Sequence, residues 1–141
     1  MSTYSTSITI NAHQEAVWKV LSDVSRWSEW TPTVTKVEAL NNPELKLGNH
    51  YKVTQPKLQP AEWIVTVLTP PSSFTWESKS TGMHMVAEHI LKAKGGDQTE
   101  LTLTFAFHGW LGKLIGAIYG KMSAGYIQTE AQSLKKRVEN L

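Results

Sequence analysis

His89 is the ionisable side chain whose position most suggests chemistry. It lies in Met83–Ala93, where Glu88 and Lys92, together with Lys94 directly after the segment, mark the water-facing positions of an alternating strand. The odd positions of this strand, His89 among them, are therefore predicted to face the interior. A buried neutral imidazole can orient a ligand carbonyl or act as a general base. The competing interpretation is a core histidine bonded to a tyrosine or to a backbone carbonyl.

The surroundings predicted for His89 favour the second interpretation. Tyr51 and Tyr119 are its candidate partners, but no Asp or Glu falls on the same inner face to orient the ring. This absence weakens the case for a catalytic triad or a cyclase. His89 is consequently a weak catalytic candidate.

Metal and cofactor chemistry have little support. The chain has no cysteine, so thiolate catalysis, disulfides and sulfur ligands are excluded. The positions of His84 and His89 differ by an odd number, so these side chains lie on opposite faces of one strand. His84 and His108 have no accompanying carboxylate motif. Gly95-Gly96-Asp97 is typical of a hairpin turn rather than a phosphate loop. We expect no metal and no cofactor.

The same alternation predicts an inner sheet surface that is mostly aromatic, aliphatic or thioether. A surface of this kind suits a largely apolar guest with one or two polar groups, but it suits a filled core equally well. Val67 and Gln55 are also expected to point inward. The predicted ligand-binding residues on the strands are Tyr51, Trp63, Trp76, Ser78, Met83, Met85, His89, Phe105 and Phe107.

Three further candidates come from helical segments. Trp18, Trp27 and Trp30 are crowded into the stretch VWKVLSDVSRWSEWTPTV. These indoles either plug the protein's own core, which is the favoured interpretation, or close over a guest. Trp18, Trp30 and Tyr119 complete the predicted ligand-binding set.

These residues are positioned by an α+β arrangement. A strand at 4–10 precedes a helix that Asn11 can cap, and a further helical turn at Trp27–Trp30 ends at Pro32. A long helix is predicted from Gly109 onward. Between these helices, alternating segments separated by Pro- or Gly-bearing turns predict an antiparallel meander. Its strands are expected at 33–40, 48–56, 61–68, 74–80, 83–93 and 100–108.

The long helix carries glycines at a spacing of four residues, at Gly112, Gly116 and Gly120, with Ala124 extending the row. Each glycine disfavours a helix by up to about 1 kcal/mol relative to alanine, so the row suggests a purpose. Close packing on the sheet is the favoured explanation. Clearance for a ligand and a hinge in the helix are the alternatives.

Composition limits the class of protein. The 141 residues carry a formal charge of +2 and only 18% charged residues, without the basic stripe of a nucleic-acid-binding protein. No segment has the length and apolar character of a membrane span, and residues 1–10 do not have the pattern of a secretory signal. We expect a cytoplasmic monomer or weak homodimer that binds no nucleic acid and does not insert stably into membranes.

Several segments together resemble a known family. EAVWKVLSDVSRWSEWTPTV, LGNHYKV, EWIVTVLTPPSSFTWES and GWLGKLIGAIYGKM resemble the polyketide cyclase/dehydrase-like branch of the START-like superfamily, also called SRPBCC or helix-grip. The resemblance covers nearly the whole chain. It implies one domain over residues 1–141, with a curved antiparallel sheet of about seven strands wrapped around a long C-terminal helix. The resemblance also implies a deep cavity, with one end closed by two short helices after the first strand. In such a fold Trp18 would face the core, and Trp27 and Trp30 would pack where the short helices meet the sheet edge.

The family is functionally diverse, so the resemblance leaves several functions open. The leading hypothesis is the binding of a small apolar or amphipathic molecule, such as a lipid, an aromatic or a polyketide-like compound. The alternative is a cyclase, dehydratase or hydrolase that uses His89 and a tyrosine in the same cavity. A third possibility is a helper protein that docks through the surface near Gly109 and Trp110.

Overall fold

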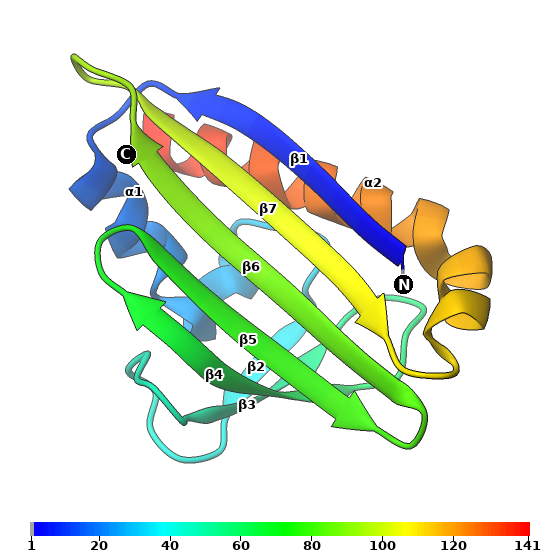
Figure 1. The fold of residues 1–141 in the computed structure, drawn as a ribbon. Coiled ribbons are helices and arrows are strands. Elements are labelled where there is room, and N and C mark those ends of the chain that lie inside the picture. Colours follow the sequence, from blue (N-terminus) through cyan, green and yellow to red (C-terminus); the bar gives the residue numbers. More distant parts are fainter. Residues whose placement is uncertain (1) are drawn as a thin grey trace.

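The computed structural model describes residues 2–141, in which a long helix crosses one face of a curved antiparallel sheet (Figure 1). The α+β helix-grip prediction is confirmed. The elements are β1 (Ser2–Ile10), α1 (Gln14–Leu21), the 3₁₀ helix η1 (Val24–Glu29), β2 (Lys36–Ala39), β3 (His50–Thr54), β4 (Ala61–Thr69), β5 (Ser73–Ser80), β6 (Met83–Ala93), β7 (Thr99–His108) and α2 (Gly112–Glu139).

The seven strands follow the order β1-β7-β6-β5-β4-β3-β2. Strands β2 to β7 are neighbours in sequence and in space, as expected of segments joined by short turns. The exception is β1, which pairs along its length with β7, from Ser2 opposite Phe107 to Ile10 opposite Thr99. Helix α2 packs on β1 and β7, and η1 contacts β2. The helix therefore covers one side of the sheet face and leaves room beside it.

The glycine row lies where α2 is closest to the sheet. A Cβ atom added at Gly112 would be 3.1 Å from the Phe107 carbonyl oxygen, and one added at Gly120 would be 1.9 Å from the Tyr4 hydroxyl. The Tyr4 hydroxyl also donates a hydrogen bond to the Gly116 carbonyl, at 3.2 Å. These contacts support the close-packing explanation of the row.

The predicted cap of the first helix is wrong. Helix α1 begins at Gln14 after His13, and no side chain caps it. Asn11 instead connects other elements. Its backbone N–H donates to the Glu139 carboxylate at 2.8 Å, and its side-chain oxygen accepts from the Gln98 amide at 2.9 Å. Asn11 thus joins the end of β1 to the end of α2.

One predicted strand face is inverted partway along β4. Trp63 and Val65 point into the core as expected, but a β-bulge between Val65 and Val67 shifts the register. Because one extra residue reverses all later side chains, Val67 is 46% exposed while Leu68 packs against the core.

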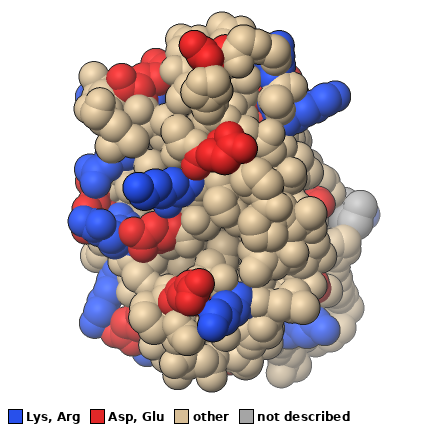
Figure 2. All heavy atoms as spheres, turned by 90° about the vertical axis from the view of Figure 1, so that its left-hand side faces the viewer, with Lys and Arg blue, Asp and Glu red and all other residues tan. Residues whose placement is uncertain are grey.

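Acidic and basic side chains are interspersed on the side of the molecule that carries α1 and the C-terminal end of α2 (Figure 2). Arg137 pairs there with Glu29 at 3.2 Å, and Lys135 pairs with Glu139 at 2.6 Å. None of the helices in residues 2–141 combines the length and apolar character required to cross a bilayer.

Candidate functional site

Two adjoining chambers lie between the sheet and α2. The outer chamber has a volume of about 420 Å³, and the inner one about 60 Å³. Exposed Lys57 and Gln59, from the loop between β3 and β4, stand at the edge of the outer chamber. The chambers share lining residues, so they form one elongated site. The shared residues are Gln55, Leu58, Trp63, Phe105 and Ser123.

The outer chamber is predominantly apolar. Strands β6 and β7 contribute side chains from their inner faces, and α2 contributes Ile115 and Tyr119 from the opposite wall. The thioethers are flexible and polarisable, so this wall can adapt to different guest shapes. The strand residues are Met83, Met85, Phe105 and Phe107.

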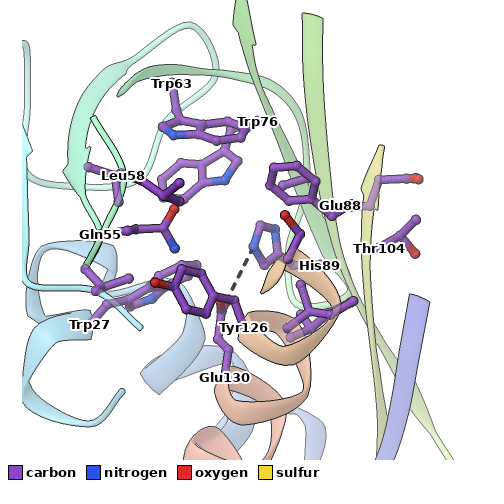
Figure 3. Close-up of a pocket in the computed structure, with 17 residues that line it drawn as sticks. Trp27, Gln55, Leu58, Trp63, Trp76, Glu88, His89, Thr104, Tyr126 and Glu130 are labelled. Carbon is purple, nitrogen blue, oxygen red and sulfur yellow. Dashed lines mark ion pairs between the residues drawn. The ribbon is translucent and has the colours of Figure 1, made fainter. Parts of the chain in front are cut away.

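The inner chamber is enclosed by aromatic rings (Figure 3). Trp27 is the central ring. Its centroid lies 5.3 Å from that of Trp76 and 5.4 Å from that of His89. Its indole N–H donates to the Leu21 carbonyl at 2.8 Å, so the buried polar atom is satisfied. Trp27 therefore lines the chamber with its indole N–H already bonded elsewhere.

His89 has a defined orientation in this chamber. Its ring stacks on Phe74 with centroids 4.0 Å apart, and Nδ1 lies 3.1 Å from the Phe74 carbonyl oxygen. A carbonyl only accepts hydrogen bonds, so Nδ1 carries the proton of the neutral ring. The lone pair of Nε2 is then available as an acceptor. Nδ1 therefore has the backbone partner expected of a core histidine, whereas Nε2 faces α2.

Glu130 of α2 faces this second nitrogen. Its carboxyl group is buried, and Oε1 lies 3.9 Å from His89 Nε2 (Figure 3). Burial raises the pKa of Glu130 to about 8. Burial also lowers the pKa of His89 to about 4, although the bond to Phe74 acts in the opposite direction. Desolvation disfavours both charged forms, so we assign the proton to the carboxyl group at neutral pH.

The pair presents a hydrogen-bond donor and an acceptor to the same small space. The separation of 3.9 Å is too long for a direct hydrogen bond, so both groups are free to bind a third. A guest carbonyl or hydroxyl can accept from the Glu130 O–H, and a guest hydroxyl can donate to Nε2 of His89. The chamber therefore combines an apolar wall with one neutral polar end.

Tyr126 closes the inner chamber on the side of the β3–β4 loop. Its hydroxyl donates a hydrogen bond to the Pro56 carbonyl. This bond ties α2 to the loop that carries Gln55 and Leu58, which both line the site.

The structure brings most of the predicted ligand-binding residues together. One group of them lines the outer chamber, another lines the inner one, and Trp63 and Phe105 line both. The residues found at the cavity are Trp63, Trp76, Met83, Met85, His89, Phe105, Phe107 and Tyr119.

Four predicted residues do not line either chamber. Trp18 packs edge-on against Phe74 and otherwise faces a separate surface depression, and Trp30 lies in another beside Arg137. The Tyr51 hydroxyl is turned away from the site, where it donates to backbone carbonyls of Asn42 and Glu44 at 3.2 and 2.9 Å. Ser78 is buried in the sheet without contributing to the lining.

The most important residue missed from the sequence is Glu130. The predicted inner face around His89 consisted of strand residues, whereas Glu130 lies on α2. Its spacing contains a usable signal, since Ile127, Ala131 and Leu134 share the buried face of α2 with it. Ser123 and Tyr126 also lie on the helix, and Trp27 was predicted as a plug of the core, with closure over a guest as the alternative.

The histidines on the outer face of the sheet have a carboxylate partner that the sequence did not reveal. His84 Nε2 lies 2.5 Å from Glu77 Oε1, and the His84 and His108 ring centroids are 5.5 Å apart. Among residues 2–141, no group of three or more His, Cys, Asp or Glu side chains is arranged to hold a metal ion.

Solved structures share this fold at low sequence identity. Norcoclaurine synthase from Thalictrum flavum, in complex with dopamine and hydroxybenzaldehyde, has a TM-score of 0.78 and 11% identity, covering 99% of this chain and 87% of that chain. The Zhui aromatase/cyclase from a Streptomyces species has a TM-score of 0.75 and 18% identity, covering 98% and 93%. A conserved protein from Geobacillus kaustophilus has a TM-score of 0.72 and 18% identity, covering 99% and 96%.

These likenesses establish the fold alone. Among curated proteins there is no significant match. The family comparison is more specific, because residues 1–139 match the family described as polyketide cyclase/dehydrase and lipid transport. With nearly its whole length matched, and with a helix-grip fold around a cavity, the chain belongs to this polyketide cyclase/dehydrase and lipid transport family.

Proposed function

We propose that this protein is a cytoplasmic binding protein for a small, largely apolar molecule with one polar end. The observation that carries the proposal is the outer chamber of about 420 Å³. Small-molecule pockets span about 300–1,000 Å³ and are lined mostly by apolar side chains with a few polar groups. The family's association with polyketide and lipid chemistry supports the same class of guest.

The two chambers support one orientation of this guest. Its apolar body occupies the outer chamber, against Met83, Met85 and Phe107, and its polar end reaches the inner chamber. Because Glu130 donates and His89 accepts, the polar end is an uncharged carbonyl, phenol or hydroxyl group. A carboxylate is disfavoured there, since its buried negative charge would have no cation to pair with. The guest class is therefore aromatic or polyketide-like alcohols and ketones, or lipids with a neutral head.

Cavity filling tests the proposal. The protein is titrated with flavonoids, sterols and fatty acids, and bound guests are detected by native mass spectrometry. Ile115→Trp fills the outer chamber, whereas Leu114→Trp makes the same kind of change at a neighbouring residue that does not line it. We expect a guest adduct in the wild type and in Leu114→Trp, and its loss in Ile115→Trp. No adduct from any class, or equal adducts in all three proteins, would overturn the proposal.

A second candidate function is acid–base catalysis, favoured by the facing pair of His89 and Glu130. In a β-hydroxy ketone, Nε2 of His89 would remove a proton from the carbon next to the carbonyl. The electrons of that C–H bond form the C=C bond, the C–O bond of the β-hydroxyl breaks, and the Glu130 proton completes the departing water. The proton held by His89 then returns to Glu130. A pKa of about 4 makes His89 a weak base, so binding is the primary proposal.

Turnover distinguishes these two functions. An aromatic β-hydroxy ketone is supplied, and formation of the conjugated enone is followed by absorbance. A catalyst loses turnover by at least about a hundredfold in His89→Gln while it still binds the substrate. A carrier shows no turnover above the uncatalysed rate and keeps its affinity within about tenfold, because one hydrogen bond at most is lost.

A further inference from the structure

The outward face of the first half of α2 carries apolar side chains that are exposed to solvent, since no other element in residues 2–141 covers them. Trp110 is 76% exposed, Leu114 57% and Ile118 61%. The spacing of four residues places these side chains along one side of the helix and its entry turn. We call them, with the exposed Lys113 and Lys121, the α2 ridge.

The ridge is basic as well as apolar. Between His108 and Thr129, the charged residues are Lys113 and Lys121, and no Asp or Glu occurs. The opposite side of the molecule differs, because acidic and basic side chains are interspersed there (Figure 2). The ridge therefore offers apolar side chains flanked by unopposed positive charge.

Trp110 is held in place although it is exposed. Its indole lies against the β5–β6 turn, where a Cβ atom added at Gly82 would come within 2.6 Å of the ring. Gly82 has a φ of 74°, a conformation that glycine adopts readily. The turn thus fixes an amphipathic indole at the end of the ridge, and such rings favour the boundary between bilayer and water.

We propose that the α2 ridge docks on an anionic lipid bilayer. An amphipathic helix with Trp and Leu on its apolar side and flanking lysines lies in the interface plane of a membrane, where anionic lipids attract the lysines. A second copy of the chain fits the ridge poorly. A two-fold contact brings the same patch together, and it would place four lysines side by side without an acidic partner.

The position of the ridge connects docking with the cavity. Ile115 and Tyr119 line the outer chamber and alternate along α2 with the ridge residues Leu114 and Ile118. A docked helix therefore holds the chamber beside the bilayer, so an apolar guest can pass between the two with little exposure to water. This step rests on the proposed binding function, but docking itself does not require a guest.

Vesicle flotation without added guest tests the docking surface. Phosphatidylcholine vesicles with and without phosphatidylserine are mixed with wild-type protein, and we expect flotation only with phosphatidylserine. Leu114→Ser/Ile118→Ser should lower the partition coefficient by about tenfold or more, because two aliphatic side chains leave the interface. The matched control is Leu47→Ser/Leu141→Ser, which alters side chains that are 65% and 80% exposed elsewhere. The control should float as the wild type does.

The lysines provide an independent arm. Lys113→Gln/Lys121→Gln should weaken binding to phosphatidylserine vesicles by about fivefold per lysine, and added salt should reduce the wild-type binding in the same way. Circular dichroism and thermal melts of each variant establish that the fold is retained.

The outcomes separate docking from guest binding. A wild type that does not float, or a control that loses as much binding as the ridge variant, overturns the docking proposal. So does sedimentation that shows a dimer dissociated by Leu114→Ser/Ile118→Ser. Protein that floats but holds no guest in native mass spectrometry overturns the proposed binding function and leaves docking supported.

Discussion

The C-terminal half of α2 (residues 126–139) inserts Ile127, Leu134 and Val138 into the core, whereas the N-terminal half (residues 112–125) buries only glycines. In the first region large side chains fill the space beneath the helix. In the second, glycines bring the backbone against β1 and β7, and Ile115 and Tyr119 border the outer chamber.

The difference shows how one helix can both anchor a fold and enclose a cavity. Where α2 contributes bulky core residues, these side chains pack against the core and leave only the small inner chamber beside Ile127 and Glu130. Where it contributes glycines, the helix backbone itself contacts the sheet. The larger side chains of this half lie on the other sides of the helix, where they line the cavity or are exposed to solvent. We expect stability to reside mainly in the C-terminal half, which also borders the inner chamber, and contacts with the membrane and with the apolar body of the guest to lie in the N-terminal half.

The largest expected effect is a core truncation in the anchoring half. Leu134 is 1% exposed, so Leu134→Ala should lower the free energy of unfolding by about 2–5 kcal/mol. Leu114→Ala makes the same change in the other half and should alter it by at most about 0.5 kcal/mol. Urea denaturation of both variants measures the contrast. Similar losses in the two would contradict the proposed division of the helix.

The buried pair of His89 and Glu130 predicts how stability depends on pH. The folded pair holds one proton between its pKa values of about 4 and about 8. In the unfolded chain, Glu130 loses its proton near its ordinary pKa of 4.5, and His89 loses its own near 6.5. Above pH 6.5 the folded state holds more protons than the unfolded state, so stability falls as pH rises.

This decline amounts to about 2 kcal/mol between pH 6.5 and pH 8, at 1.36 kcal/mol per pH unit. Glu130→Gln should abolish it, because the variant pair no longer holds a proton in this range. Urea denaturation at a series of pH values compares the two proteins, and the other histidines cancel in the comparison. If both proteins lost stability equally above pH 6.5, Glu130 would not be the group responsible.

The next largest change in stability is expected on substitution of glycines in α2. Gly120→Ala should destabilise the fold by about 1–2 kcal/mol, because the added methyl group meets the Tyr4 hydroxyl and forces the helix or the ring to move. Gly125→Ala is the matched control, since no atom lies within 4 Å of its added Cβ, and it should stabilise the helix by up to about 1 kcal/mol. Thermal denaturation measures both. Equal stabilisation by the two substitutions would show that α2 is not in close contact at Gly120.

The smallest effect is expected at the surface of the anchoring half. Arg137→Ala removes the ion pair between Arg137 Nη2 and Glu29 Oε1, which bridges α2 and η1 at 3.2 Å. Partly exposed pairs of this kind contribute at most about 1 kcal/mol. Urea denaturation measures the change in the free energy of unfolding. If the loss were as large as that of Leu134→Ala, the ion pair rather than the core packing would anchor this half of the helix.

The sequence was sufficient for the fold and for most strand faces. Alternation holds without interruption in β5, β6 and β7, so the inward positions of Trp76, His89 and Phe107 followed from period alone. It failed in β4 after Val65, because a single inserted residue leaves no distinct mark in a strand of valines and isoleucine. The helix-over-sheet arrangement followed from the predicted elements, because the long helix is the only one large enough to cover the sheet, and the family resemblance implied the same arrangement.

The site was harder to predict because it depends on contacts across elements. Glu130 and His89 are far apart in sequence, and their meeting requires the position of α2 over the sheet. Trp18 and Trp30 have the composition of lining residues, but the angles of α1 and η1 turn them toward surface depressions. Cavity volume depends on the few side chains that leave space unfilled, which periodicity does not encode.

The pairing of β1 with β7 also decides when the cavity can form. Residues 2–10 find their strand partners in residues 99–107, and Tyr4 finds its hydrogen-bond acceptor in Gly116. Contacts between such distant segments form slowly, because a long chain must close before they are made. On the ribosome, the strands from β2 to β6 can pair with their neighbours as they emerge, while β1 remains without a partner. The chambers are thus completed only after α2 has been synthesised, so a guest can be loaded only from that point onward.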